Sequence, residues 1–134
     1  LFAGLLTAES DVGRALVVVF SDGVDTGSWL RAEAVLDVAK RSDAVVYAVT
    51  TLHEGRGEFL SHVVEATGGS LTEVESKDDI GAAFLQVLDE FRQRYLISYT
   101  PRGVAKDGWH AVNVRVKSRS GLKVKARPGY WGGQ

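Results

Sequence analysis

The residues best suited to chemistry follow directly after an uninterrupted apolar run at residues 15–20. The next eight residues read SDGVDTGS, which places the carboxylates of Asp22 and Asp25 among hydroxyls and glycines. Carboxylate and hydroxyl oxygens are ligands that a hard cation can bind. The same residue types dominate turns, where an Asp begins the turn or caps the following helix. Spacing alone therefore leaves a cation site and a plain turn equally open.

The segments around these residues predict an α/β fold. Three short apolar segments are typical of strands buried within a parallel sheet, and they lie at 15–20, 44–49 and 70–74. Three segments with apolar residues at helical spacing alternate with them, at 28–42, 58–69 and 76–95. This alternation predicts a parallel sheet with helices on both faces.

Capping residues mark the ends of two predicted helices. Ser28 is well placed to cap the first helix, and Ser76 with Asp79 resembles a capping box at the start of the third. In the third helix Phe84 and Phe91 belong to the apolar stripe. We therefore expect both rings to be buried against the sheet.

The predicted sheet places the SDGVDTGS segment at an edge where ligands bind. In an open parallel sheet, ligands bind beyond the carboxyl ends of the strands. Asp22 is the candidate metal ligand. Asp25 is expected to hold Asp22 in position without binding the metal itself. The other residues of this rim follow the first two strands and are Ser21, Gly23, Thr26, Ser28 and His53.

After Tyr95 the apolar period changes from helical to alternating. Residues 109–118 and 122–131 alternate apolar and polar side chains around an RSG turn, which predicts an antiparallel hairpin. Residues 95–101 are expected to add a third strand. The outer face of this extension carries five cations, which are Arg115, Lys117, Lys123, Lys125 and Arg127.

Composition and charge limit the possible functions. The 134 residues include no Cys, which excludes disulfides, thiolate metal sites and cysteine nucleophiles. No apolar run approaches the roughly 20 residues that span a bilayer. Residues 1–91 hold 6 Lys or Arg and 16 Asp or Glu, a balance of −10, whereas residues 92–134 hold 10 and 1, a balance of +9. No aromatic residues interleave with the hairpin cations, so we expect a solvated face and no binding of nucleic acid. The alternative is that this face docks onto an acidic region of the missing N-terminal part.

Several stretches of the chain, in order, resemble one bacterial family. LVVVFSDG resembles the third metal-site motif of von Willebrand factor A-type (VWA) domains, and RYLISYTP and VKARPGYW resemble segments of the VWA-related family known from acidobacteria. The resemblance implies a Rossmann-like sheet of strand order 3-2-1-4-5-6, whose last three strands are present here. It divides the chain into a partial VWA-like domain at 1–94 and a β extension at 95–134. It also suggests a secreted or cell-envelope location.

Part of the family's metal site is missing from the sequence. VWA metal sites combine an Asp-x-Ser-x-Ser motif, a Thr from a middle loop and the Asp of the SDG turn. Only the last is present, as Asp22. The first residues, from Leu1, resemble the end of a helix, so we expect an N-terminally truncated domain. Because Mg²⁺ prefers an octahedral shell of oxygens, we expect no cofactor in this chain, and Mg²⁺ or Mn²⁺ only in a full-length domain.

Two classes of function remain. The first is a non-enzymatic VWA-like module of the adhesion type, which binds a protein partner at the rim. The alternative is a metal-dependent hydrolase that uses Asp22, Asp25 and His53, although none of the motifs GxSxG, HExxH, Walker A and GxGxxG occurs. An EF-hand loop from Asp22 to Glu33 is disfavoured because Val24 stands at its third position.

The strand at 15–20 also predicts self-association. In the family's strand order it would pair on one side with a strand that this chain lacks. An exposed apolar edge without Lys or Pro is a template for pairing with another chain. We therefore expect a homodimer through the 15–20 edges, unless residues 1–9 fold back over them.

Overall fold

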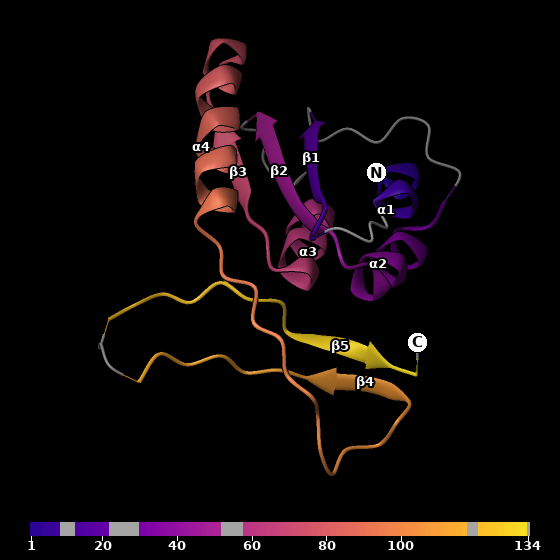
Figure 1. Cartoon of the computed structure of the whole chain (residues 1–134). Coiled ribbons are helices and arrows are strands. Elements are labelled where there is room, and N and C mark those ends of the chain that lie inside the picture. Colours follow the sequence, from indigo (N-terminus) through magenta and orange to yellow (C-terminus); the bar gives the residue numbers. More distant parts are fainter. Residues whose placement is uncertain (9–12, 22–29, 52–57, 118–120, 134) are drawn as a thin grey trace.

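A computed structural model of the chain describes residues 1–8, 13–21, 30–51, 58–117 and 121–133. Its helices are α1 (Phe2–Thr7), α2 (Ala32–Arg41), α3 (Glu58–Thr67), the 3₁₀ turn η1 (Lys77–Asp79) and α4 (Ile80–Arg92). Its strands are β1 (Leu16–Ser21), β2 (Val45–Thr51), β3 (Leu71–Val74), β4 (Gly108–Ala111) and β5 (Gly129–Gly132). The elements from α1 to α4 form a body, and β4 and β5 lie beneath it in Figure 1. None of the described helices is long and apolar enough to cross a membrane.

The sheet β1–β2–β3 is parallel throughout, as the sequence pattern predicts. Its strands are neighbours in chain order, and Leu16 pairs with Val45 while Ser21 pairs with Thr50. β2 is the central strand and is buried from Val45 to Thr50, which explains its continuous apolar sequence. The result is a mixed α/β fold whose parallel sheet and flanking helices fit a Rossmann-like layout.

Helices cover the two faces of the sheet unequally. Side chains of a strand point alternately to opposite faces, so β1 and β2 contribute to two cores. The core on one face packs α1, α2 and α3 against the sheet and includes Leu5, Val35, Val46, Leu60 and Val63. On the other face, the core beneath α4 includes Val45, Tyr47, Val49, Val74 and Val87. Among the described helices, α4 alone packs on this second face, and the α4 side of β1 is incompletely covered.

The structure corrects the predicted burial of the α4 rings. Phe84 is 38 % exposed, and its ring centroid lies 6.2 Å from that of Phe20, which is also exposed. The prediction for Phe84 is wrong because α4 lies over β2 and β3, so this ring reaches past the covered part of the sheet. Phe91 is partly buried and packs against the core beneath α4.

The predicted helix starts are partly confirmed. The Asp79 carboxylate accepts a hydrogen bond from the backbone N–H of Ser76 at 3.2 Å, which is one half of a capping box. The first predicted helix corresponds to α2, which starts at Ala32 rather than at residue 28. Its expected cap, Ser28, lies outside the described residues.

The C-terminal extension forms less sheet than the sequence predicts. β4 and β5 pair antiparallel over four residues each, with Trp109 opposite Trp131. Residues 95–101, 112–117 and 121–127 are not strands, so the three-stranded extension is wrong.

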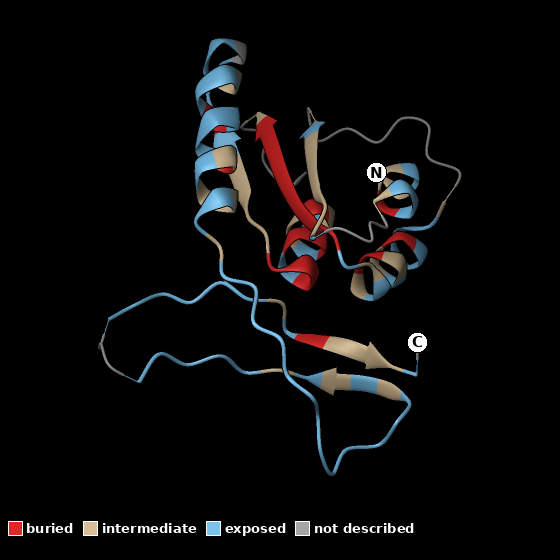
Figure 2. Ribbon diagram, viewed as in Figure 1, coloured by how far each residue is buried: buried red, intermediate tan, exposed pale blue. Residues whose placement is uncertain are grey.

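Contact with the body explains where this pairing ends. The guanidinium of Arg41 in α2 lies 4.2 Å from the ring centroid of Trp131, so the paired part is held against the body. Figure 2 shows most of the remaining extension as exposed. A two-stranded ribbon without a packing partner is marginal in water, which is the physical reason that regular pairing stops near Ala111.

Candidate functional site

The rim predicted from the sequence starts at the carboxyl edge of the parallel sheet. Ser21 ends β1 and Thr51 ends β2, and the register places these two strand ends beside each other. The remaining rim residues lie outside the described residues, and they are Asp22, Gly23, Asp25, Thr26, Ser28 and His53. Ser21 and Thr51, which directly precede the two segments that carry the other rim residues, thus lie at one edge of the sheet.

The described residues do not provide a metal site at this edge. No group of three or more His, Asp or Glu side chains within them could hold a metal ion. Ser21 offers one hydroxyl, whereas Mg²⁺ requires a nearly octahedral set of about six oxygens. The described part of the chain therefore does not fit a VWA-type metal site by itself.

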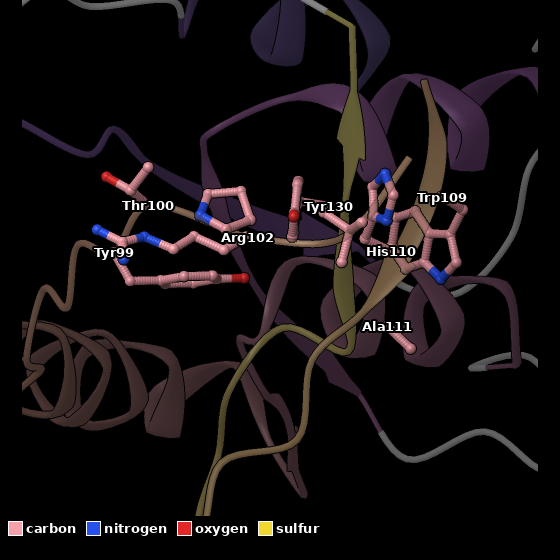
Figure 3. A pocket seen from close by; sticks show the side chains of 9 residues that line it. Tyr99, Thr100, Arg102, Trp109, His110, Ala111 and Tyr130 are labelled. Atoms are coloured by element: carbon pink, nitrogen blue, oxygen red, sulfur yellow. The ribbon is translucent and has the colours of Figure 1, made fainter. Parts of the chain in front are cut away.

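A second candidate site lies at the opposite end of the body, on the outer side of the β4–β5 ribbon. It is an open pocket of about 440 Å³ between the ribbon and residues 99–104. Its lining combines aromatic rings with polar side chains and includes Tyr99, Arg102, Trp109, His110 and Tyr130. Figure 3 shows Tyr130 between Tyr99 and Arg102 on one side and His110 and Trp109 on the other.

Ring stacking builds the wall of this pocket. His110 and Tyr130 face each other across the ribbon, and their ring centroids are 5.0 Å apart in a stacked arrangement. The Tyr99 ring meets Tyr130 edge-on at 6.3 Å. Burial, followed by the neighbouring Tyr99 hydroxyl, raises the pKa of Tyr130. Tyr130 is therefore a neutral hydrogen-bonding group near neutral pH rather than an activated one.

The pocket offers aromatic rings and a guanidinium as binding groups. Among the described residues, no group hydrogen-bonds the buried Nε2 atom of His110, and a Cβ at Gly132 would lie 2.9 Å from it. This nitrogen lies close to the backbone of β5 at Gly132. No Asp or Glu is among the lining residues, so the pocket offers no carboxylate to assist a base. It can hold a planar or anionic group between its rings and Arg102.

A polar cluster joins the C-terminal region to the body at the amino edge of the sheet. The Tyr47 hydroxyl donates to Glu90 at 3.1 Å and accepts from Arg94 at 2.8 Å. Lys125 adds an ion pair to Glu90 at 3.1 Å. Burial raises the pKa of Tyr47, while the hydrogen bond and charge of Arg94 oppose that rise.

Arg127 strengthens this junction, and Arg14 lies close enough to Arg127 for their charges to oppose each other. Arg127 donates to the Lys40 carbonyl at 2.8 Å and pairs with Asp43 at 3.3 Å. Burial, followed by the charge of Arg127, lowers the pKa of Arg14, and Asp43 partly offsets this. A Cβ at Gly68 would lie 2.6 Å from the backbone N of Arg127. The junction is thus a structural contact in which Arg, Lys and backbone groups of both regions meet.

Sequence reasoning did not identify the aromatic pocket. The sequence pattern places His110, Tyr99 and Tyr130 only in predicted strands. A usable signal was present, because WH at 109–110 and YW at 130–131 place two aromatic residues at matching positions of the predicted hairpin. Because neighbouring residues of a strand point to opposite faces, the two aromatic pairs lie on opposite faces of the ribbon. The His110–Tyr130 pair lines the pocket.

Comparisons with known proteins add little to this geometry. No family model matches the chain, and no curated protein matches it. Among solved structures, the crystal structure of an uncharacterized membrane spanning protein from Vibrio fischeri is similar, with 20% identity and a TM-score of 0.49. The match covers 60% of this chain and 48% of that one, so this chain spans about half the length of the Vibrio protein. A likeness at this level carries no argument about function.

Proposed function

We propose that this chain is part of a VWA-like, non-enzymatic module that binds a protein partner at the carboxyl edge of its parallel sheet. The observation that supports the proposal most is the order of the sheet. β1, β2 and β3 are parallel neighbours joined in sequence through helices, which is what the fourth to sixth strands of a VWA-like sheet require. In this proposal the rim beyond Ser21 and Thr51 meets the partner.

The proposal treats the metal site as incomplete in this chain. Asp22 has none of the co-ligands that the Asp-x-Ser-x-Ser motif supplies, since that motif is absent from the sequence. We therefore expect the chain to bind Mg²⁺ or Mn²⁺ weakly or not at all. Titration calorimetry with each metal alone tests this expectation.

The result that contradicts this part of the proposal is equally clear. Micromolar or tighter binding of Mn²⁺ that is lost in Asp22→Ala would mean that this chain holds its own metal site. Asp37→Ala is a matched control, because Asp37 is an exposed carboxylate on α2. Loss of binding in both variants would indicate nonspecific attraction to an acidic surface rather than a site.

The second candidate function is a metal-dependent hydrolase that uses Asp22, Asp25 and His53. Its support is that the segments carrying these residues follow strands that end at the same edge of the sheet. Reaction requires a positioned nucleophile and base, and we expect no turnover. Metal-dependent hydrolysis of a model phosphoester or ester, abolished by Asp22→Ala and retained by Asp37→Ala, would favour this alternative instead.

A further inference from the structure

The C-terminal region leaves an unusual amount of apolar surface without cover. Fourteen large apolar side chains are exposed among the described residues, and ten of them lie between Tyr95 and Val124. Monomeric soluble proteins rarely expose contiguous apolar patches larger than a few hundred Å². Exposure concentrated in one region therefore points to a surface that a partner covers.

The part of this region that projects farthest is residues 112–117 and 121–127, which we call the arm. Its exposed apolar side chains are Val114, Val116, Leu122 and Val124. They alternate with Arg115, Lys117, Lys123 and Lys125. The Val112 N–H donates to the Pro128 carbonyl at 2.8 Å, and beyond that bond the described arm residues are in no strand pair. The arm thus offers an apolar stripe backed by cations.

The body carries a complementary surface, which we call the open patch. It consists of the neighbouring rings of Phe20 at the end of β1 and Phe84 on α4, together with Leu85. Leu85 follows Phe84 on the side of α4 turned away from the core residues Ala83 and Val87, and it is 64 % exposed. Phe20 and Phe84 are exposed because α4 covers β2 and β3 but leaves part of β1 open. Exposed carboxylates lie before and after Leu85 along the chain, at Asp78 in η1 and at Asp89 in α4.

The arm of one chain does not cover its own open patch. Lys125 is held at Glu90, near the C-terminal end of α4. Phe84 and Leu85 lie nearer the N-terminal end of that helix. In Figure 1 the arm extends below the body and away from the carboxyl ends of the strands, beside which Phe20 lies.

Charge favours a second copy of the chain as the occupant. Residues 92–134 carry a net charge of +9 and residues 1–91 carry −10. Arm cations already find body carboxylates within one chain, as the Lys125–Glu90 and Arg127–Asp43 pairs demonstrate. Arg115, Lys117 and Lys123 form no ion pair with another described residue. These cations would steer the arm toward an acidic body and would act within a Debye length of about 10 Å.

We propose that two copies of this chain associate reciprocally, with the apolar stripe of each arm covering the open patch of the other copy. Such an exchange is self-complementary, because each copy gives an arm and receives one. It differs from pairing of two β1 edges, since the contact is between side chains of the arm and of the β1–α4 surface. It is also independent of the proposed rim function, which lies in other residues.

Engineered cysteines test the contact directly, because the chain has none of its own. Chains with Leu85→Cys are mixed with chains with Val116→Cys and oxidised, and the products are separated without reductant. We expect a mixed disulfide dimer. Leu6→Cys replaces Leu85→Cys in the control, since Leu6 is an exposed apolar residue on α1 and lies outside both surfaces. A mixed dimer that forms equally with both partners would overturn the proposal.

Sedimentation of the cysteine-free chain supplies the second test. We expect a concentration-dependent dimer that Val116→Glu weakens by at least about tenfold, equivalent to about 1.4 kcal/mol. Leu6→Glu, with the same change in charge, should leave it unchanged, and circular dichroism checks that both variants fold. A monomer throughout the micromolar range would overturn the proposal. A dimer that survives Val116→Glu but is lost in folded Val18→Pro would also overturn it, in favour of β1 edge pairing.

Discussion

The body and the arm have similar fractions of apolar residues, but these residues are buried in the body and exposed in the arm. In the body, apolar residues recur on both faces of β2 and on the inner sides of α2, α3 and α4, so they meet each other and are buried. In the arm, apolar residues alternate as regularly, yet Val114, Val116, Leu122 and Val124 are exposed. An apolar pattern stabilises structure only where a second surface is available to pack against it.

The two regions also differ in how their polar groups are used. At the junction, Tyr47, Glu90 and Arg94 form a connected set of hydrogen bonds beneath α4. In the arm, Lys125 reaches Glu90, and Arg115 bonds to Asn113 at 3.2 Å within the arm itself. The junction therefore fixes the base of the arm, and the rest is left for a partner.

Truncating one leucine in each region tests this comparison with the largest expected effect. Leu60→Ala in α3 should lower the free energy of unfolding by about 2–5 kcal/mol, because Leu60 is 7 % exposed within the core. Leu122→Ala in the arm should change it by less than about 0.5 kcal/mol in dilute protein, because Leu122 is 53 % exposed. Urea unfolding measures both. Equal losses would show that the arm is as tightly packed as the body.

Two glycines give the next largest contrast. A Cβ on Gly69 would lie 1.8 Å from the Val46 carbonyl oxygen, so Gly69→Ala must displace β2 or the turn before β3. We expect a loss of at least about 1–3 kcal/mol, the scale of overpacking. Gly81→Ala in α4 meets nothing within 4 Å and should stabilise by about 0.5–1 kcal/mol. Thermal unfolding measures the stability of both variants. If Gly69→Ala and Gly81→Ala changed stability in the same direction, the close approach at Gly69 would be contradicted.

Alkaline pH should weaken the junction through Tyr47. Burial raises the pKa of Tyr47 above its ordinary value of 10.0 in the folded chain. The resulting stability is complete below the unfolded-state pKa and is lost as the pH rises through the folded-state pKa. Stability should therefore fall more steeply above about pH 10 in the native chain than in Tyr47→Phe. Tyr95→Phe, at an exposed tyrosine, should keep the native slope. Identical slopes for the native chain and Tyr47→Phe would contradict the assignment.

The smallest effect is expected at the ion pair between the arm and the body. Lys125 and Glu90 are 42 % and 30 % exposed, and exposed pairs contribute about 0–1 kcal/mol. Lys125→Ala should therefore cost less than about 1 kcal/mol. Lys123→Ala removes a neighbouring cation that makes no ion pair with a described residue, and it should cost less still. A loss above about 2 kcal/mol in denaturant unfolding would mean that this single pair dominates the junction.

The sequence by itself determined the elements of the body. The continuous apolar run in β2 requires cover on both faces, and the alternation of strand and helix leads to a parallel sheet. These are local patterns with a direct physical cause, so the strands of the sheet and the helices α3 and α4 lie within a few residues of their predicted bounds. The positions of Ser21 and Thr51 at one edge follow from the parallel register.

Only the tertiary structure decided which of these sequence patterns lead to burial and strand pairing. The exposure of Phe84 depends on where α4 lies across the sheet, and the helical pattern of α4 does not contain that position. The alternation in the arm is the same whether or not a surface covers it, so it could not reveal that pairing ends after Ala111. The pocket between Tyr99, His110 and Tyr130 brings together residues from distant parts of the chain. Burial and such contacts are properties of the packed chain, whereas periodicity is a property of each segment.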